Sequence, residues 1–228
     1  QWKGCGIMPT GSQLQQFQNA QQNETFEYAV EPLTPRLTVA QKTFQERCQV
    51  FRRTLNDSDF LNDRGIGNDM GFYTFCYDPA LELQARQFFE QLEKESQNGK
   101  LPCNIIHRNL YDILLEILEE EEILDLVPRQ EQRRGTEELT KQIKRIASPQ
   151  SFSRHLECDP HQKGDVLLIS GVGEVYPLLR VHVLLDNMQA NFSDVPVVIA
   201  YPGVYTGQSF SLFGRLDDGN YYRAFDLL

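Results

Sequence analysis

The sequence has no apolar run long enough to cross a membrane. A membrane-spanning helix needs about 18 or more consecutive apolar residues, and no stretch of the 228 residues approaches that length. The first residues, QWKGCGIMPTG, also lack the charged region and the apolar region of a signal peptide. We therefore expect a protein that neither contacts a membrane nor is exported.

The sequence contains fewer basic than acidic residues. Lys and Arg total 22 against 32 Asp and Glu, which gives a net charge of −10. A surface of this sign repels nucleic acid unless a local basic patch overrides the repulsion, so we expect DNA to be reached only indirectly, through other proteins. A direct contact stays open as a further hypothesis, because the chain has one basic cluster: Arg133, Arg134, Lys141, Lys144 and Arg145. The acidic run 119–122 is interpreted as a solvated helix face.

Paired cysteine motifs are missing as well. The five cysteines are odd in number and widely spaced, which predicts free thiols and favours the reducing cytoplasm. His155, Cys158 and His161 lie three residues apart, but a structural zinc site takes four ligands and no second half-site is evident. We therefore expect no metal centre.

The sequence signatures of catalysis do not occur either. There is no GxSxG elbow, no HExxH motif and no cysteine in the context of a nucleophile. His182 with Arg180 could form an acid/base pair, but a partly buried histidine with satisfied ring nitrogens is the favoured interpretation. We expect no catalytic residue, no cofactor and no enzymatic activity.

The composition is that of an ordinary globular protein. Hydrophobic residues make up 40% of the chain and charged residues 24%, which is enough for a packed core. Residues 1–36 are rich in Gln, Asn and Pro and carry few apolar anchors, so we predict a weakly ordered or extended arm there. Residues 37–228 are predicted to form a single α/β domain.

Hydrophobic spacing within 37–228 predicts alternating strands and helices. Short apolar or aromatic runs predict strands at 72–77, 103–107, 166–169 and 197–201. Helical periodicity and capping residues predict helices at 38–56 and 178–188 and after Asp78, Asn109, Thr136 and Ser148. The predicted fold class is α/β: a mainly parallel sheet flanked by helices, with an N-terminal helical extension, a helical insertion at about 109–160, and a C-terminal antiparallel hairpin around the turn 217–220.

The segment DVLLISGVGEVYP, residues 165–177, is the first candidate site. Its apolar run predicts a buried strand, and open α/β sheets bind ligands where such strands end. The candidate ligand turn consists of Gly171, Gly173, Glu174 and Tyr176. A phosphate-binding loop of the Walker type would need a Lys followed by Ser or Thr, which this turn lacks. A tight strand-to-helix turn is the alternative interpretation.

The second candidate site is the aromatic C-terminal region, residues 201–225. Tyr and Arg are enriched in protein interaction hot spots because they combine a large contact area with polar tips. The candidate partner-binding residues are Tyr201, Tyr205, Gln208, Phe213, Arg215, Tyr221, Tyr222 and Arg223. The alternative is that alternate aromatic residues cover the core.

Several ordered motifs together resemble the BrxB family of the bacterial BREX phage-resistance systems. They are DFLNDRGIGNDMGFYTFCYDP, NLYDILLEILEE, ISGVGEVYPLLRVHVLLDNM, VPVVIAYPGVYTGQSFSLFGRL and DGNYYRAF, and they span roughly residues 55–228. The resemblance implies a cytoplasmic defence subunit that works with a methyltransferase, an ATPase and an alkaline-phosphatase-like PglZ protein. It implies nothing about the arm.

Two functional hypotheses follow. The first is a non-catalytic assembly or adaptor subunit that binds another BREX protein, such as the PglZ-like protein, through the C-terminal hairpin and the Gly171 turn. The second is a degenerate nucleotide-binding, NTPase-like domain that uses the GVGEVYP turn.

Overall fold

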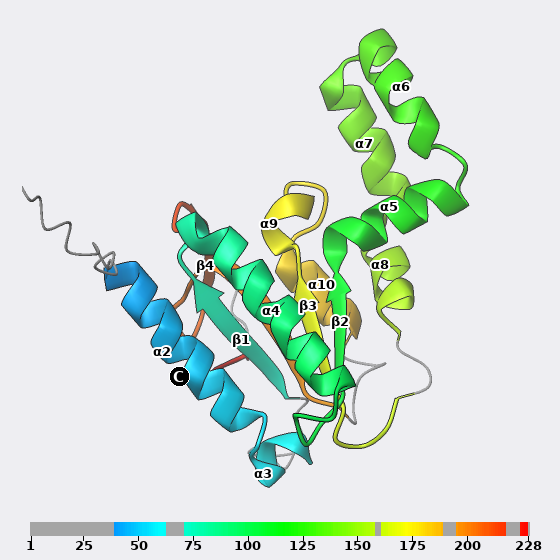
Figure 1. Cartoon of the computed structure of the whole chain (residues 1–228). Helices are drawn as coiled ribbons and strands as arrows, with labels where there is room; N and C mark the ends of the chain where they lie inside the picture. Colours follow the sequence, from blue (N-terminus) through cyan, green and yellow to red (C-terminus); the bar gives the residue numbers. More distant parts are fainter. Residues whose placement is uncertain (1–38, 63–70, 158–160, 189–194, 218–223, 228) are drawn as a thin grey trace, which may run out of the picture. The chain divides into compact units, whose positions relative to one another are not determined.

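The computed structural model describes residues 39–62, 71–157, 161–188, 195–217 and 224–227 (Figure 1). All of them belong to the unit Thr38–Leu228. The predicted arm 1–36 lies outside the described residues, and so do Cys158, Tyr221, Tyr222 and Arg223. The extent of the arm and of the domain therefore stays a prediction.

A parallel sheet forms the centre of this unit. Its strands lie in the order β2-β3-β4-β1-β7, and each neighbouring pair is parallel. The strands are β1 (Phe72–Tyr77), β2 (Ile105–Asn109), β3 (Val166–Ser170), β4 (Val197–Tyr205) and β7 (Phe225–Asp226). The prediction of a mainly parallel α/β sheet is confirmed.

Helices cover both faces of the sheet, so β3 is buried throughout and β1 and β4 are buried over most of their length. On β3, Val166 and Leu168 pack into one apolar cluster, whereas Leu167 and Ile169 pack into the other. This arrangement explains the unbroken apolar run of the strand, because a strand that is buried on both faces has no polar side to alternate with. The carboxyl end of β3 thereby becomes a fixed corner of the core.

One face carries α2 (Val39–Thr54) and α4 (Glu82–Gln97), which follows a 3₁₀ turn at Pro79–Leu81. Here Phe44 and Phe51 of α2 pack on Phe75 and Phe88, with ring centroids 5.7–6.3 Å apart. Phe89 packs on Phe75 and Phe88 in turn, at 5.5 and 5.6 Å. Such aromatic packing is dominated by buried area, with a further contribution from ring geometry. The predicted N-terminal helix is thus part of the core, and the short α3 (Ser58–Leu61) follows it.

The helices between β2 and β4 follow the other face. Those that pack on it are α5 (Leu110–Glu120), α8 (Pro149–Leu156), α9 (Val172–Val175) and α10 (Val181–Met188). A 3₁₀ turn at Leu124–Leu126 leads from α5 to α6 (Val127–Arg134) and α7 (Thr136–Ile146), which stand beyond α5 (Figure 1). The predicted caps are present: the side chains of Asp78, Asn109 and Ser148 accept hydrogen bonds from the backbone N–H groups of Ala80, Tyr111 and Ser151. These caps satisfy donors that a helix start leaves unpaired.

The C-terminal hairpin exists but turns at a different place from the one predicted. Strand β4 continues through Pro202 and Gly203, and its end pairs antiparallel with β5 (Phe210–Leu212), which pairs with β6 (Leu216–Asp217). The connection between β4 and β5 is therefore formed by residues 206–209, and the connection between β5 and β6 by residues 213–215. The segment that contains Phe225 was predicted as the second strand of the hairpin, and this prediction is wrong. It pairs parallel with β1 and covers the edge of the sheet.

None of the helices among the described residues combines the length and apolar character that crossing a bilayer requires. The thiols of Cys48, Cys76 and Cys103 are free. Burial raises the pKa of Cys76 to about 11 and that of Cys103 to about 11, so both behave as small apolar core residues.

Candidate functional site

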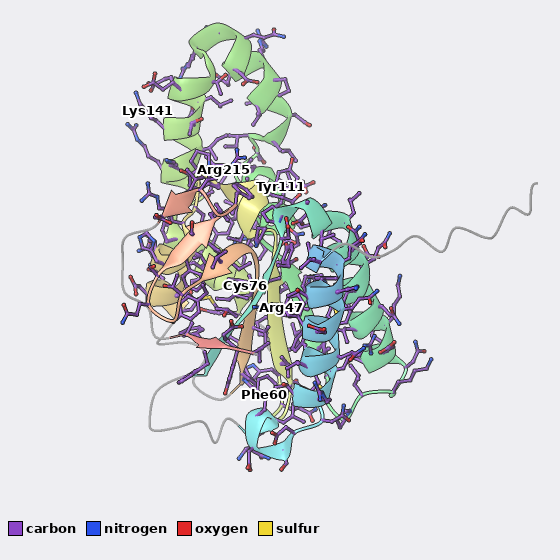
Figure 2. The ribbon with its side chains drawn as sticks, turned by 90° about the vertical axis from the view of Figure 1, so that its left-hand side faces the viewer. Arg47, Phe60, Cys76, Tyr111, Lys141 and Arg215 are labelled. Atoms are coloured by element: carbon purple, nitrogen blue, oxygen red, sulfur yellow. The ribbon has the colours of Figure 1, made fainter. Side chains whose placement is uncertain are left out.

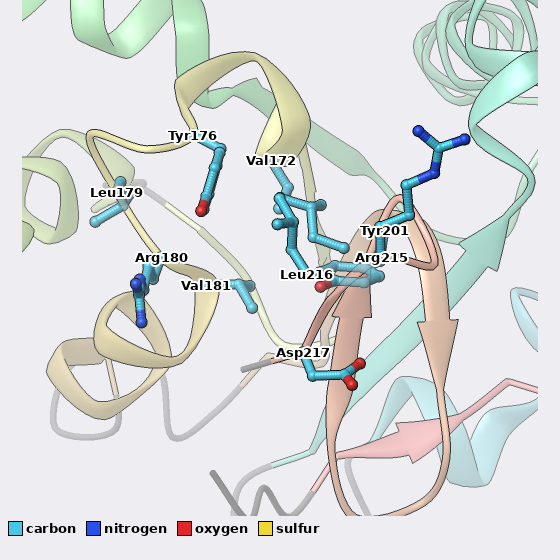
Figure 3. A pocket seen from close by; sticks show the side chains of 10 residues that line it. Val172, Tyr176, Leu179, Arg180, Val181, Tyr201, Arg215, Leu216 and Asp217 are labelled. Carbon is cyan, nitrogen blue, oxygen red and sulfur yellow. The ribbon is translucent and has the colours of Figure 1, made fainter. Parts of the chain in front are cut away.

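The two candidate segments meet at the carboxyl end of the sheet. The turn 171–177 follows β3, and the hairpin 203–217 extends β4, the strand next to β3. We call the combined surface of residues 171–181 and 201–217 the hairpin–turn face. Figure 3 shows the turn and the start of α10 on one side, with the hairpin on the other.

The glycines of the turn are required by contacts within the chain. Gly171 has φ +79°, and a Cβ atom at this position would overlap the side-chain oxygen of Asn109. A Cβ on Gly173 would lie 2.9 Å from a ring carbon of Phe213 and 3.2 Å from Pro202. These contacts give the structural interpretation of the turn a specific basis, whereas ligand binding there stays a prediction. Helix α9 has only four residues, and the peptide bond from Tyr176 to Pro177 is cis.

Glu174 forms an ion pair with a neighbouring arginine. The guanidinium group of Arg86 on α4 lies 2.8 Å from the Glu174 carboxylate and donates a 3.0 Å bond to Glu82. The Tyr77 hydroxyl donates to Glu82 over 2.7 Å. The hydrogen bond that Arg86 donates to Glu82 chiefly raises the pKa of Arg86, and burial chiefly raises the pKa of Tyr77. This network ties the turn to α4 and to the end of β1.

A cavity of about 220 Å³ opens between the turn and the hairpin. Its lining residues are Val172, Tyr176, Leu179, Arg180, Val181, Tyr201, Leu212, Arg215, Leu216 and Asp217. Figure 3 shows the Tyr176 hydroxyl directed toward this space and the Arg215 guanidinium directed away from it. An apolar interior with polar and charged groups at its rim is suited to holding an apolar side chain of another molecule.

The predicted partner-binding residues divide into core and surface. Tyr201 is 2% exposed and Tyr205 is 8% exposed, and both rings pack on Phe210 at 4.7 and 4.6 Å. They hold the hairpin in place and have little surface to present. Phe213, Arg215 and Gln208 are exposed, whereas Tyr221, Tyr222 and Arg223 lie outside the described residues.

Sequence analysis missed two apolar residues of this face. Val204 is 52% exposed and Leu216 is 39% exposed. A second hollow lies beside the cavity, and Phe213, Arg215 and Leu216 line it together with Asp78 and Pro79. Arg215 and Leu216 therefore border both hollows. Alternation along β4 after Tyr201 would have indicated Val204, but the Pro-Gly pair suggested that the strand ends there.

A histidine lies between a serine and a glutamate in an arrangement that the sequence did not indicate. The Ser170 hydroxyl lies 2.8 Å from Nε2 of His107, and Nδ1 of His107 lies 3.6 Å from the carboxylate of Glu93. Burial lowers the pKa of His107 despite the nearby Glu93. Ser170 is only 5% exposed, so the arrangement joins β2 to β3 and does not present a nucleophile to solvent.

Of the remaining candidates, Arg180 belongs to the hairpin–turn face, whereas His155 and the basic cluster lie on other elements. Nδ1 of His155 lies 2.8 Å from the Ser151 carbonyl oxygen and Nε2 lies 3.2 Å from Glu120, so both ring nitrogens have partners within the chain. Within the described ranges, no group of three His, Cys, Asp or Glu side chains could hold a metal ion. Arg180 borders the cavity, with His182 following on α10, and the predicted basic cluster lies on α6 and α7.

Comparison with known proteins gives consistent matches. A family model described as BREX protein BrxB matches residues 106–227, which include the whole hairpin–turn face. A BREX protein BrxB of Bacillus cereus (strain H3081.97) is 33% identical over 82% of this chain and 98% of its own length. One of Escherichia coli O9:H4 (strain HS) is 31% identical over 80% of this chain and 90% of its own length. No solved structure gave a significant match.

Proposed function

This chain belongs to the BrxB family of BREX proteins, and we propose that it acts in bacterial phage defence as a non-catalytic assembly subunit of a BREX system. Its task is to bind another protein of the system through the hairpin–turn face. The PglZ-like protein is the first partner to test, followed by the ATPase and the methyltransferase. DNA is reached chiefly through that complex, in the cytoplasm.

The observation that carries this proposal is the grouping of exposed apolar and cationic side chains around two hollows. Phe213, Leu216 and Arg215 project from a hairpin whose own core residues are fixed, so the surface is preformed. Binding to a preformed surface avoids the entropy cost of ordering it. Aromatic residues, Leu and Arg that border hollows are the groups that anchor protein interfaces.

The chemistry of the described residues also supports a role in binding. The hydroxyl–imidazole pair at the end of β3, Ser170 with His107, is shielded from solvent. Glu174, the acidic residue of the turn, is paired with Arg86. An adaptor needs neither a nucleophile nor a free acid, whereas an enzyme of the hydrolytic type needs both to be accessible.

The test measures binding of the purified chain to each purified BREX partner by calorimetry. The variant Leu216→Asp places a charge between the two hollows, and it should weaken the complex at least about tenfold, which corresponds to about 1.4 kcal/mol. Leu83→Asp is the matched control, because Leu83 is a 70% exposed leucine on α4. It should leave binding unchanged. Absence of any complex at micromolar concentration, or equal effects of both variants, contradicts the proposal.

A further inference from the structure

The outlying helical hairpin formed by α6 and α7, residues 127–146, has a surface unlike that of the rest of the chain. Figure 1 shows the two helices standing beyond α5, away from the sheet. Helix α6 has no buried residue, and α7 buries only Leu139 and Ile143. The pair is held mainly by contacts between its own helices, and most of its side chains face solvent.

Charge is distributed differently here from elsewhere. Residues 124–147 contain six basic and four acidic residues, for a net charge of +2, whereas the other residues together carry −12. Lys141 pairs with Glu137 at 3.0 Å and lies 3.9 Å from Glu138; Figure 2 shows it on the outer side of the hairpin. Five exposed cations have no carboxylate partner in the part of the chain that the structure describes: Arg129, Arg133, Arg134, Lys144 and Arg145.

The side chains between these cations decide which kind of partner fits. Residues 129–138, RQEQRRGTEE, contain no apolar side chain, and the apolar residues between them and Lys144, Leu139 and Ile143, are buried. A protein interface takes most of its binding energy from buried aromatic and apolar anchors, which are absent from this segment. Nucleic-acid interfaces are more polar and much more positively charged, and four of the five cations are arginines, which bind phosphate with two donors at once.

We propose that the α6–α7 hairpin binds the phosphate backbone of a nucleic-acid duplex without reading its sequence. This goes beyond the adaptor function and uses a surface separate from the hairpin–turn face. The acidic run 119–122 lies at the base of the hairpin. The eight residues of α6 rise about 12 Å from that base, which exceeds the screening length of about 8 Å at physiological salt. The acidic run therefore opposes Arg133 and Arg134 at the tip only weakly, whereas Lys144 and Arg145, in the last turn of α7, lie nearer to it.

The expected binding is weak and strongly dependent on salt. Each phosphate contact on a duplex contributes about −0.9 to the slope of log affinity against log salt. Five contacts give a slope of about −4.5, which is a loss of about 500-fold between about 50 and 200 mM salt. The dissociation constant at physiological salt should fall in the range of non-specific binding, about 10⁻⁴ to 10⁻⁶ M.

Fluorescence anisotropy of the full chain with labelled duplexes of about 20 base pairs, roughly two helical turns, tests the proposal. One arm uses DNA and one uses RNA, because both present the same backbone charge. Two paired variants, Arg133→Gln with Arg134→Gln and Lys144→Gln with Arg145→Gln, should each reduce the slope by about 1.8. Because they lie on different helices, one still reports if the other disturbs the hairpin, and circular dichroism checks the fold of both.

Lys141→Gln is the matched control. It removes one positive charge from the same hairpin, but this charge is already neutralised by Glu137, so the slope should hardly change. No binding of either duplex at about 50 mM salt overturns the proposal, and so does binding that the paired variants leave intact. Equal, arginine-dependent binding of poly-glutamate also overturns it, since the partner would then be an acidic protein surface.

Discussion

The substitution Gly171→Ala should destabilise the protein more than the same change at a comparable glycine. Gly171 has φ +79° and no room for a Cβ, because the Asn109 side chain occupies that space. Gly207 has φ +84° and nothing within 4 Å of the position of a Cβ. The two sites therefore share the backbone conformation and differ in the contact, which makes Gly207→Ala a direct control.

The magnitudes follow from two separate costs. A left-handed conformation costs a residue with a side chain about 1–2 kcal/mol, and this is the whole effect expected for Gly207→Ala. Gly171→Ala must also displace Asn109, whose side chain caps α5 by accepting a bond from Tyr111 N–H. Loss of such a cap costs about 1 kcal/mol, with a range of about 0.5–2. The sum is about 1.5–4 kcal/mol for Gly171→Ala.

Urea unfolding followed by circular dichroism measures these differences, provided that the slope of the transition is unchanged. The double variant Gly171→Ala with Asn109→Ala should lose less stability than the sum of its single variants, since the overlapping side chain is gone. Strict additivity, or equal losses for Gly171→Ala and Gly207→Ala, would refute the assignment of Gly171 to internal packing. The turn would then regain its place as a candidate ligand site.

Two further predictions concern the sheet. Burial lowers the pKa of His107 below 6.5, so the unfolded chain binds a proton at this histidine more readily than the folded chain does. The free energy of unfolding should therefore fall as pH decreases below about 6.5. Urea titrations at several pH values should show a smaller fall in the free energy of unfolding for His107→Gln, and identical pH profiles for the two proteins would contradict the buried position. Tyr205→Phe removes the hydrogen bond that the Tyr205 hydroxyl donates to the carbonyl oxygen of Ala224 over 2.9 Å. This should lower the free energy of unfolding by about 1–3 kcal/mol and speed hydrogen exchange at the backbone amide of Phe225. Unchanged exchange at Phe225 would contradict this prediction.

Local signals predicted much of the fold. Strand β1 matches its predicted range, and the caps Asp78, Asn109 and Ser148 act where their spacing indicated. These features depend on residues that lie close together along the chain. A capping side chain bonds a backbone group two or three residues away, so its role can be recognised without the fold.

Features that depend on distant residues were not predictable in the same way. The alternation of apolar and polar residues around 217–220 indicated a hairpin there. In the structure, β5 pairs with the end of β4, and Phe225 pairs with the edge of β1. Helix α6 was missed because VPRQEQRR has no apolar stripe and packs chiefly on α7. At the candidate site, Tyr201 and Arg215 are alike as interface residue types, and only the folded structure places one in the core and the other at the surface.

The neighbours of β1 have a consequence for synthesis of the protein. This strand is formed by residues 72–77, yet its partners on both sides, β4 and β7, begin at Val197 and Phe225. A nascent chain thus carries an aromatic strand with two unpaired edges until the ribosome has made nearly all of the domain. Such edges pair readily with other chains. Shielding by chaperones should therefore raise the yield of this protein, and slow elongation should lower it. Both effects should exceed the effect of its final stability.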